Sequence, residues 1–201
     1  WDWPWKNYWF AYNKAGAGSG FKFFTWDYEN TIGNNRDRAP LNKNALQNNF
    51  TGVGVLHTAL KDKEGYKLEF GDRIHRHLFN GGVLTPDLLR ERYARLADLV
   101  ELSIHAESAR WGDDHHSTPQ DIDDWLRERD WVENTYLPQR TAIVLQQFKD
   151  AGLYPRLDAP TYNQHGGVVA AGFEVSFQSP NANVYYTTDG SDPTEASTQY
   201  T

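Results

Sequence analysis

The spacing of apolar and polar positions divides the chain into an aromatic first part, a long helical middle and a short alternating end. Aromatic side chains crowd residues 8–12 and 21–26, on either side of a turn rich in glycine and serine between Gly16 and Gly20. Aromatic runs that flank such a turn are typical of a β-hairpin. The turn lacks the Gly-Lys-Ser/Thr ending of a phosphate-binding loop, so the pattern favours two antiparallel strands.

The middle of the chain, residues 55–152, carries apolar side chains at three- and four-residue spacing. This period is typical of amphipathic helices, and proline and glycine mark several of their expected ends. Five helices are expected: Val55–Leu60, about Tyr66 to Gly81, one from Thr85, one from Thr118, and about Pro138 to Ala151.

A threonine followed by proline is expected to begin both the third and the fourth helix. Thr85 takes this place in the third and Thr118 in the fourth, where Asp121 is the expected capping-box acid. The expected buried positions are Leu89, Tyr93, Leu96, Val100 and Ile104 of the third helix, and Ile143, Val144, Leu145 and Phe148 of the fifth.

Residues 33–54 lie between the hairpin and the helices and show no helical or strand period. Loops of this length in compact domains are usually functional or disordered. Arg36 and Arg38 are candidates to meet a phosphate or an acidic substrate, and a solvated loop with surface charges is an equal alternative.

The pattern changes again after Pro155. Phe173, Val175 and Phe177 alternate as a strand does, and a second strand is expected at residues 184–186, before a tight turn at 189–190. The chain is therefore expected to hold two domains, residues 1–155 and 156–201.

Composition argues against several classes of function but does not identify one. The formal charge of −7 argues against nucleic-acid binding, because no basic face is available to neutralise phosphates. No apolar run approaches the roughly 18 residues that span a membrane. Cysteine is absent, which excludes disulfides and thiolate metal sites and is consistent with an exported bacterial protein.

The histidines are not expected to bind metal. His75 and His77 are two residues apart on a helix and therefore point to different faces. The run Asp113-Asp114-His115-His116 contains suitable residue types, but no further ligand stands at helical spacing. A solvated loop is the favoured interpretation.

Three polar side chains near the hairpin are the candidate catalytic and metal-binding residues. Asp2 is followed five residues later by Asn7, and Asp27 closes the second aromatic strand. Phosphoryl-transfer enzymes use this spacing: one aspartate accepts the substrate hydroxyl proton, and an asparagine and a second aspartate hold magnesium. The alternative is that all three are turn or strand-end residues.

This stretch closely resembles the spore-coat CotH kinase family, atypical secreted or surface kinases with a divergent kinase-like fold. The resemblance covers about Trp1 to Pro155. It is carried by Asp2-Trp3-Pro4, by Asn7-Tyr8-Trp9 and by Phe23-Phe24-Thr25-Trp26-Asp27-Tyr28-Glu29. It implies that Asp2 is the catalytic-loop aspartate, that Asn7 and Asp27 hold magnesium, and that ATP is the phosphate donor. Glu29 stands where the family often has a second aspartate.

The end of the chain resembles a different family. Residues 184–194 read Val-Tyr-Tyr-Thr-Thr-Asp-Gly-Ser-Asp-Pro-Thr. From about Ala159 to Thr201 the sequence is similar to the chitobiase/β-hexosaminidase C-terminal domain, a small immunoglobulin-like sandwich appended to many secreted bacterial enzymes. Only three or so of the roughly seven strands of such a sandwich are expected here.

Together these observations predict an α+β chain: a β-hairpin and the helical, C-lobe-like part of an atypical kinase fold, then a partial immunoglobulin-like β-sandwich. The expected function is magnesium-dependent transfer of phosphate from ATP to Ser or Thr of a protein substrate, outside a bacterial cell or on its surface. The nucleotide pocket and a phosphate-binding Lys or Arg are expected upstream of Trp1, so these 201 residues alone are expected to be inactive. The alternative is a non-catalytic surface, adhesion or polysaccharide-binding module.

Overall fold

The fold is described from a computed structural model, which covers residues 6–16, 20–27, 31–32, 40–47, 51–114, 117–179 and 181–201. The chain forms two compact units, Trp1–Tyr154 and Pro155–Thr201. Helices and small sheets are mixed, so the chain is α+β. Within the described ranges, no helix combines the length and the apolar character that crossing a bilayer requires.

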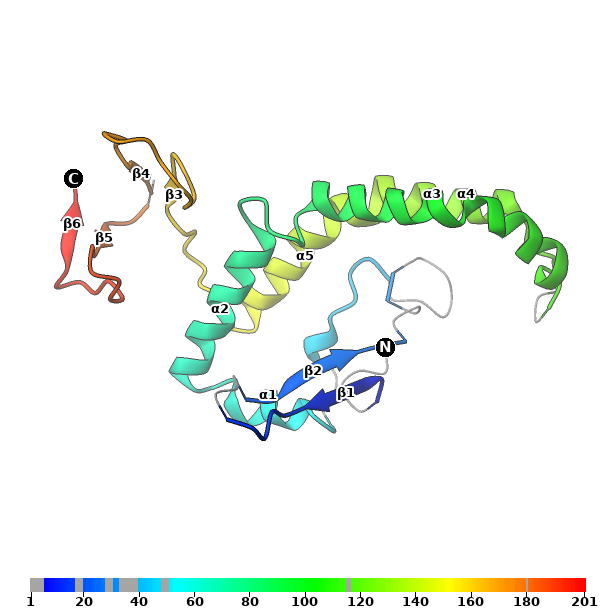
Figure 1. Cartoon of the computed structure of the whole chain (residues 1–201), viewed down its shortest axis with the longest axis horizontal. Helices are drawn as coiled ribbons and strands as arrows, with labels where there is room; N and C mark the ends of the chain where they lie inside the picture. The colour runs from blue at the N-terminus through cyan, green and yellow to red at the C-terminus, as the bar shows by residue number, and fades with distance from the viewer. Residues whose placement is uncertain are drawn as a thin grey trace. The chain divides into compact units, whose positions relative to one another are not determined.

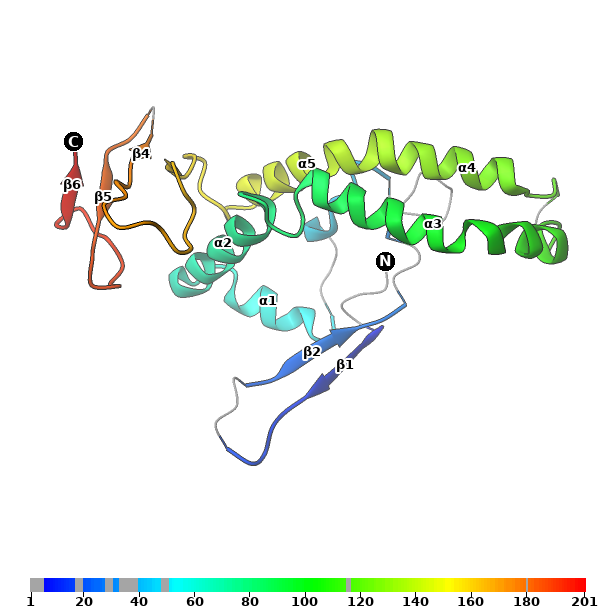
Figure 2. The ribbon, with the colours of Figure 1, turned by 45° about the horizontal axis from the view of Figure 1, so that its top comes forward.

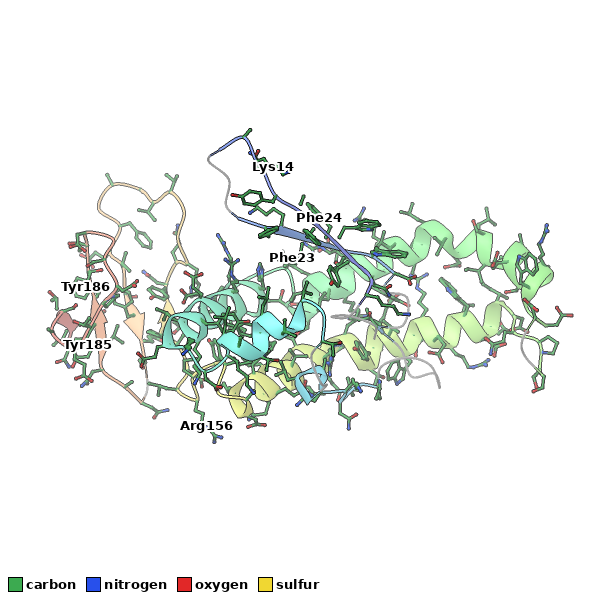
Figure 3. All side chains as sticks on the ribbon, turned by 90° about the horizontal axis from the view of Figure 1, so that it is seen from below. Lys14, Phe23, Phe24, Arg156, Tyr185 and Tyr186 are labelled. Carbon is green, nitrogen blue, oxygen red and sulfur yellow. The ribbon has the colours of Figure 1, made fainter. Side chains whose placement is uncertain are left out.

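The first unit begins with the expected hairpin. Strand β1 (Tyr8–Ala11) pairs antiparallel with β2 (Lys22–Thr25), in the register Tyr8↔Thr25 to Ala11↔Lys22. Its aromatic side chains remain largely exposed, and Figure 3 shows Phe23 and Phe24 on this hairpin with Lys14 near its tip. The hairpin therefore presents aromatic faces that the described part of the chain leaves open to solvent.

The helices follow in a long antiparallel arrangement (Figure 1). Their bounds are η1 (Ala45–Gln47, a 3₁₀ turn), α1 (Gly54–Leu60), α2 (Glu64–Leu78), α3 (Pro86–Trp111), α4 (Ile122–Trp131), η2 (Val132–Tyr136, a π-helical turn) and α5 (Leu137–Asp150). α3 runs beside α4 and α5, which follow one another through η2, and α2 packs on α5 (Figure 2). The five expected helices are present, and η1 interrupts the segment 33–54 that was expected to be all loop.

The main buried cluster lies at η2. Val132, Tyr136 and Leu137 are between 2% and 4% exposed, and Leu89 and Tyr93 of α3 pack against them. A π-helical turn adds one residue to the helical turn and so rotates the face that α5 presents relative to α4. This rotation lets α4 and α5, which follow one another in sequence, both bury a face against α3.

Two expectations for α3 were wrong. Leu96 and Val100 are 55% and 46% exposed, whereas Ala97 is 5% exposed and faces the neighbouring helix. On the same stretch of α3, Asp98 and Glu101 bond to Arg129 of α4. A pattern of apolar residues does not reveal that polar side chains take part in the contact between two helices.

The expected starts of α3 and α4 also need correction. Thr85 precedes α3 as expected, but its hydroxyl donates to the carbonyl of Gly82 at 2.8 Å and does not cap the helix. In α4 the N-cap is Asp121 and not Thr118, and its carboxylate accepts from the backbone N–H groups of Asp123 and Asp124. The chain is held at Gln120, whose N–H donates to the carbonyl of Gly112 at 2.7 Å, so the helix starts later than proline suggested.

One arginine joins the helices. Arg129 of α4 donates to Glu133 at 2.7 Å, to Glu101 at 2.7 Å and to Asp98 at 2.6 Å, and its own side chain is 18% exposed. The bond to Glu133 and then the bond to Asp98 raise the pKa of Arg129 above its usual range. The guanidinium therefore links α3, α4 and η2 at one point.

The second unit contains two short strand pairs. β3 (Thr161–Tyr162) pairs with β4 (Phe177–Gln178), and β5 (Val184–Tyr186) pairs with β6 (Thr198–Tyr200). β5 matches the expected strand, but Phe173 and Val175 lie outside any strand. Asn163 explains this difference: its amide donates to the carbonyl of Glu174 at 2.8 Å and accepts from the N–H of Ser176 at 3.0 Å. The Asn163 side chain thus bonds to the backbone of Glu174 and Ser176, as a neighbouring strand would do.

Replacing Arg129 with methionine is expected to destabilise the first unit by about 2 kcal/mol, because three carboxylates lose their shared donor. Asp98 and Glu101 are well exposed, so solvent screening limits the expected decrease in the free energy of unfolding. Urea unfolding followed by circular dichroism measures the change. Arg129→Lys should recover only part of the loss, since one ammonium cannot bond all three carboxylates in this geometry. Full recovery by lysine would show that charge alone matters.

Acidification is expected to destabilise the packing of α1 on α2 through His57. The His57 Nδ1 lies 2.8 Å from the Tyr66 hydroxyl, and burial, followed by Lys61, lowers the pKa of His57. The unfolded chain then takes up a proton more readily than the folded chain. Stability is therefore fully present above about pH 6.5 and is lost as the pH falls toward the lower folded-state pKa.

The urea midpoint, compared at about pH 7.5 and about pH 5.5, measures this effect. His57→Gln keeps a polar group near Tyr66 without a titrating ring, and it should reduce the difference between the two midpoints. The control is His105→Gln on the exposed face of α3. An equal reduction by the control would contradict the assignment to His57.

Candidate functional site

The hairpin brings Asn7 and Asp27 together at its open end. Asn7 directly precedes β1 and Asp27 follows β2 by two residues. The ladder continues past the strands, because the N–H of Trp26 donates to the carbonyl of Asn7 at 3.1 Å. The Asn7 side-chain amide then reaches the carbonyl of Asp27 at 3.4 Å. Two residues twenty apart in sequence are therefore neighbours.

Both residues have a left-handed backbone. The φ angle is 63° at Asn7 and 62° at Asp27. Asn and Asp tolerate this region better than other residues with a side chain, but it still costs free energy and is uncommon. Such conformations gather at functional sites, where the surrounding structure holds them. Here the β1–β2 ladder supplies that restraint.

The oxygen atoms at this point are the type that magnesium prefers. The Asn7 amide donates through its nitrogen, which leaves its Oδ1 available as a ligand. The carboxylate of Asp27 is exposed and has no bonding partner among the described residues. Carboxylate, amide and water oxygens suit Mg²⁺, which usually keeps several waters. The donor set therefore fits the metal that the sequence implied.

The third predicted member, Asp2, lies outside the described residues. Its place beside Asn7 and Asp27 stays a prediction. The described ranges contain no group of three or more His, Cys, Asp or Glu side chains suited to a metal. A magnesium site here would therefore depend on Asn7, Asp27, waters and residues from the uncovered ranges.

The segment that follows Asp27 is fixed to the helical core. Ile32 and Leu41 pack on the buried cluster at η2, and the Tyr136 hydroxyl donates to the carbonyl of Thr31 at 3.5 Å. Burial raises the pKa of Tyr136, and Arg140 opposes this effect. Tyr136 thus remains a neutral donor. Its hydroxyl links Thr31, which follows the hairpin in sequence, to the helices.

Sequence reasoning missed two side chains that hold this segment further along. Arg140 of α5 donates to the carbonyls of Leu41 at 2.6 Å and Lys43 at 2.8 Å. Gln147, two turns later, donates to the carbonyl of Asn42 at 3.1 Å. A long-range bond from a side chain to a loop carbonyl leaves no periodic signal in a sequence. The predicted phosphate contacts, Arg36 and Arg38, lie outside the described residues.

His75 contacts two aromatic side chains in the structure. Its Nδ1 lies 3.0 Å from the Tyr154 hydroxyl, and its ring stacks on Phe79 with centroids 4.9 Å apart. These contacts tie the end of α2 to the residues after α5. His115 and His116 lie outside the described residues, so the interpretation of that loop stays a prediction.

An aromatic cavity of about 460 Å³ lies within the second unit. Tyr162 and Phe177 contact edge to face at 5.0 Å, and Phe177 also contacts Tyr200 at 4.8 Å. Tyr185 and Tyr186 on β5 line the same cavity, and Figure 3 labels both. The expected turn is present, because Asp189 accepts from both the N–H and the hydroxyl of Ser191.

Residues 164–201 match the family model of the chitobiase/beta-hexosaminidase C-terminal domain. The match covers the cavity's β5 wall and includes neither Asn7 nor Asp27. No curated protein and no solved structure gave a significant match to the chain. Residues 164–201 are thus the part of the chain with a demonstrated similarity to a known family.

Manganese, as a paramagnetic substitute for magnesium, is expected to broaden the backbone amide signals of Asn7 and Asp27 at the lowest metal concentrations. The reason is that their oxygens form a hard-donor pair on a rigid ladder. Two-dimensional NMR of the chain, titrated with MnCl₂, measures this broadening. Asp27→Ala should remove it, whereas Asp62→Ala, which deletes an exposed carboxylate between α1 and α2, should not. Broadening that begins elsewhere would contradict the metal site.

Proposed function

We propose that the first unit is the catalytic-loop and metal-binding part of an atypical secreted or surface protein kinase of the CotH type. Its reaction is transfer of phosphate from ATP to a Ser or Thr hydroxyl of a protein substrate. The observation that carries the proposal is the pairing of Asn7 with Asp27, both in a left-handed backbone, at the open end of the hairpin. The resemblance to the family itself rests on the motifs within residues 1–33.

Each proposed role follows from side-chain chemistry. Asn7 and Asp27 hold magnesium through amide and carboxylate oxygens, and magnesium, when bound, neutralises charge on the phosphates of ATP. Asp2 accepts the proton of the acceptor hydroxyl and orients that hydroxyl for in-line attack. The acceptor oxygen forms a bond to the γ-phosphorus as the bond to the β-γ bridging oxygen breaks, and ADP leaves.

Positioning is the larger part of such catalysis, so the supports of the site matter. Further along the chain, Tyr136 binds the carbonyl of Thr31 and Arg140 binds the carbonyl of Leu41. These bonds start from η2 and α5, the best-packed part of the unit. The β ladder supports the backbone beside Asp27, and these bonds support the described residues that follow it.

The decisive experiment measures transfer from radiolabelled ATP to protein by the full-length protein. Asp27→Ala should lower the rate by at least about two orders of magnitude, since even the outer supports of a metal site cost 10–100-fold. Removing magnesium with EDTA should have a similar effect. The loss should come without a change in melting temperature, because an exposed carboxylate contributes little to packing.

Asp62→Ala is the matched control, an exposed aspartate of the same unit that should leave the rate unchanged. Asp2→Asn separates the proton-accepting role from metal binding, because it should lower transfer without weakening manganese binding at Asn7 and Asp27. Unchanged transfer by a folded Asp27→Ala protein would refute the kinase assignment.

A second candidate function is binding of a polysaccharide by a non-catalytic surface module. The match at residues 164–201 and the aromatic cavity beside β5 support it. The matched domain is found in extracellular carbohydrate-active enzymes, which also supports secretion of this protein. Sugars stack on exposed aromatic rings, and this unit offers several. Absence of phosphate transfer by the intact protein would favour this second function.

A further inference from the structure

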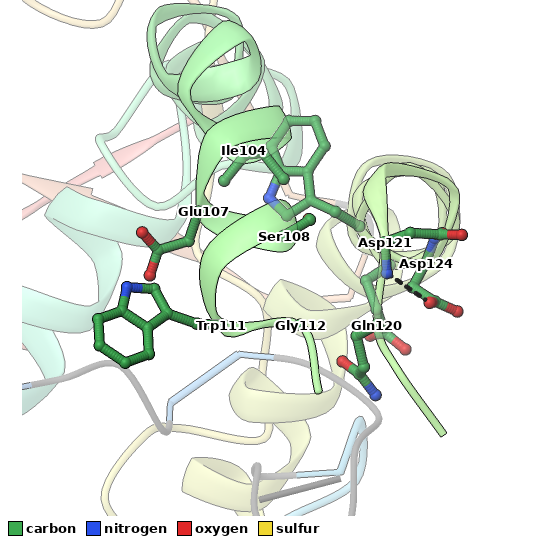
Figure 4. Close-up of a pocket in the computed structure, with 10 residues that line it drawn as sticks. Ile104, Glu107, Ser108, Trp111, Gly112, Gln120, Asp121 and Asp124 are labelled. Atoms are coloured by element: carbon green, nitrogen blue, oxygen red, sulfur yellow. Dashed lines mark hydrogen bonds between the residues drawn. The ribbon is translucent and has the colours of Figure 1, made fainter. Parts of the chain in front are cut away.

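A separate cavity of about 260 Å³ lies where α3 ends and α4 begins (Figure 4). It shares no residue with the Asn7–Asp27 pair. Glu107 and Trp111 line it from the last turns of α3, and Trp125 and Glu128 line it from α4. In Figure 4, Glu107 and Trp111 lie together on one side of the cavity and Gln120 on the other. Two indole rings and four acidic side chains, including Asp121 and Asp124, are therefore among the groups that line it.

Local contacts fix the backbone on both sides of this cavity. Gly112 ends α3, and a Cβ there would clash with the backbone carbonyl oxygens of Gln120 and Ser108. On the other side, Asp121 and Asp124 form a capping box at the start of α4. The backbone bond from Asp121, and then the bond from Arg127, lower the pKa of Asp124. These two acids are occupied, so they build the wall and do not serve as ligands.

The carboxylates of Glu107 and Glu128 are in a different position. The Oε2 of Glu128 has less than 1 Å² exposed to solvent and no hydrogen-bond partner in the described part of the chain. Glu107 is exposed to solvent and has no ion pair or hydrogen bond among the described residues. A buried, unpaired carboxylate oxygen costs free energy, and proteins normally satisfy it with a partner. Among the described residues, the Oε2 of Glu128 therefore has no donor.

The two arginines of α4 do not supply one. Arg129 is bound by Asp98, Glu101 and Glu133, and Arg127 is bound by Asp124. Residues 98–133 contain eleven Asp and Glu against three Arg, a formal charge of −8 when the whole chain carries −7. Acidic charge is therefore concentrated around this cavity, and its field attracts a positive ligand.

The indole rings indicate which kind of cation fits. The guanidinium of Arg110 lies 4.8 Å from the ring centroid of Trp111, and that of Arg129 lies 5.7 Å from Trp125. Both rings thus already attract an organic cation from their own helix. Indole rings offer no ligand to a hard divalent metal, whereas they attract organic cations. The cavity is also slightly smaller than the sites of drug-sized ligands, and it suits a group of side-chain size.

We propose that this cavity binds an organic cation, an alkylammonium or guanidinium group of the kind that ends a Lys or Arg side chain. Glu128 and Glu107 accept the N–H donors, and the rings of Trp111 and Trp125 flank the carbon chain. The site is independent of the proposed phosphate transfer. If the kinase assignment fails, the cation site is unaffected, and the reverse also holds.

The test uses N-acetyl-lysine amide and N-acetyl-arginine amide as probes, titrated into the chain. The indole N–H signals of Trp111 and Trp125 are followed by NMR and assigned with Trp111→Phe and Trp125→Phe. Both probes should shift these two signals saturably, whereas N-acetyl-norleucine amide, which has the same carbon chain without charge, should not. Glu128→Gln should weaken binding by at least about fivefold, because one charged contact is lost.

Asp113→Asn is the matched control, since it removes one charge from the same acidic region outside the cavity. Equal weakening by Asp113→Asn and Glu128→Gln would show diffuse attraction and overturn the proposal. Absence of saturable shifts in the unaltered chain, or equal shifts with the norleucine probe, would overturn it as well. Circular dichroism of each variant shows whether the helices are intact.

Discussion

The first unit depends on one buried contact, at the π-helical turn between α4 and α5. Val132, Tyr136 and Leu137 meet Leu89 and Tyr93 of α3 there, and they are among the few side chains of the unit that are almost fully removed from solvent. Ile32 and Leu41 reach the same cluster from the segment after the hairpin. The packing of the helices and the anchoring of Ile32 and Leu41 thus depend on the same hydrophobic cluster.

A polar contact sets the geometry around this cluster. Arg129 of α4 bonds Asp98 and Glu101 of α3 and Glu133 of η2. On the same stretch of α3, Ala97 is buried while Leu96 and Val100 are exposed. The small side chain of Ala97 permits a close helix approach. Where α3 ends and α4 begins, acidic side chains and indole rings line the cavity that contains Glu128.

The apolar core is small for a unit of this length, and large aromatic surface stays open on the hairpin. Trp9 is 71% exposed and Phe24 is 57% exposed, although both belong to paired strands. Apolar surface of this extent usually marks an interaction site. The ladder fixes the backbone of Asn7 and Asp27 without needing these rings, so the rings are available for contact with substrate, partner or further protein.

The sequence alone determined the hairpin, the presence of the five α-helices and the candidate pair. Aromatic runs beside a glycine-rich turn predicted β1 and β2, and the hairpin followed by Asp27 predicted that Asn7 and Asp27 meet, because antiparallel pairing is a local rule. Only the tertiary structure decided which side chains of α3 are buried, the anchoring of residues 41–43 by Arg140 and Gln147, and the unpaired oxygen of Glu128. These depend on side chains that meet across long sequence separations, and residue spacing carries no record of such contacts.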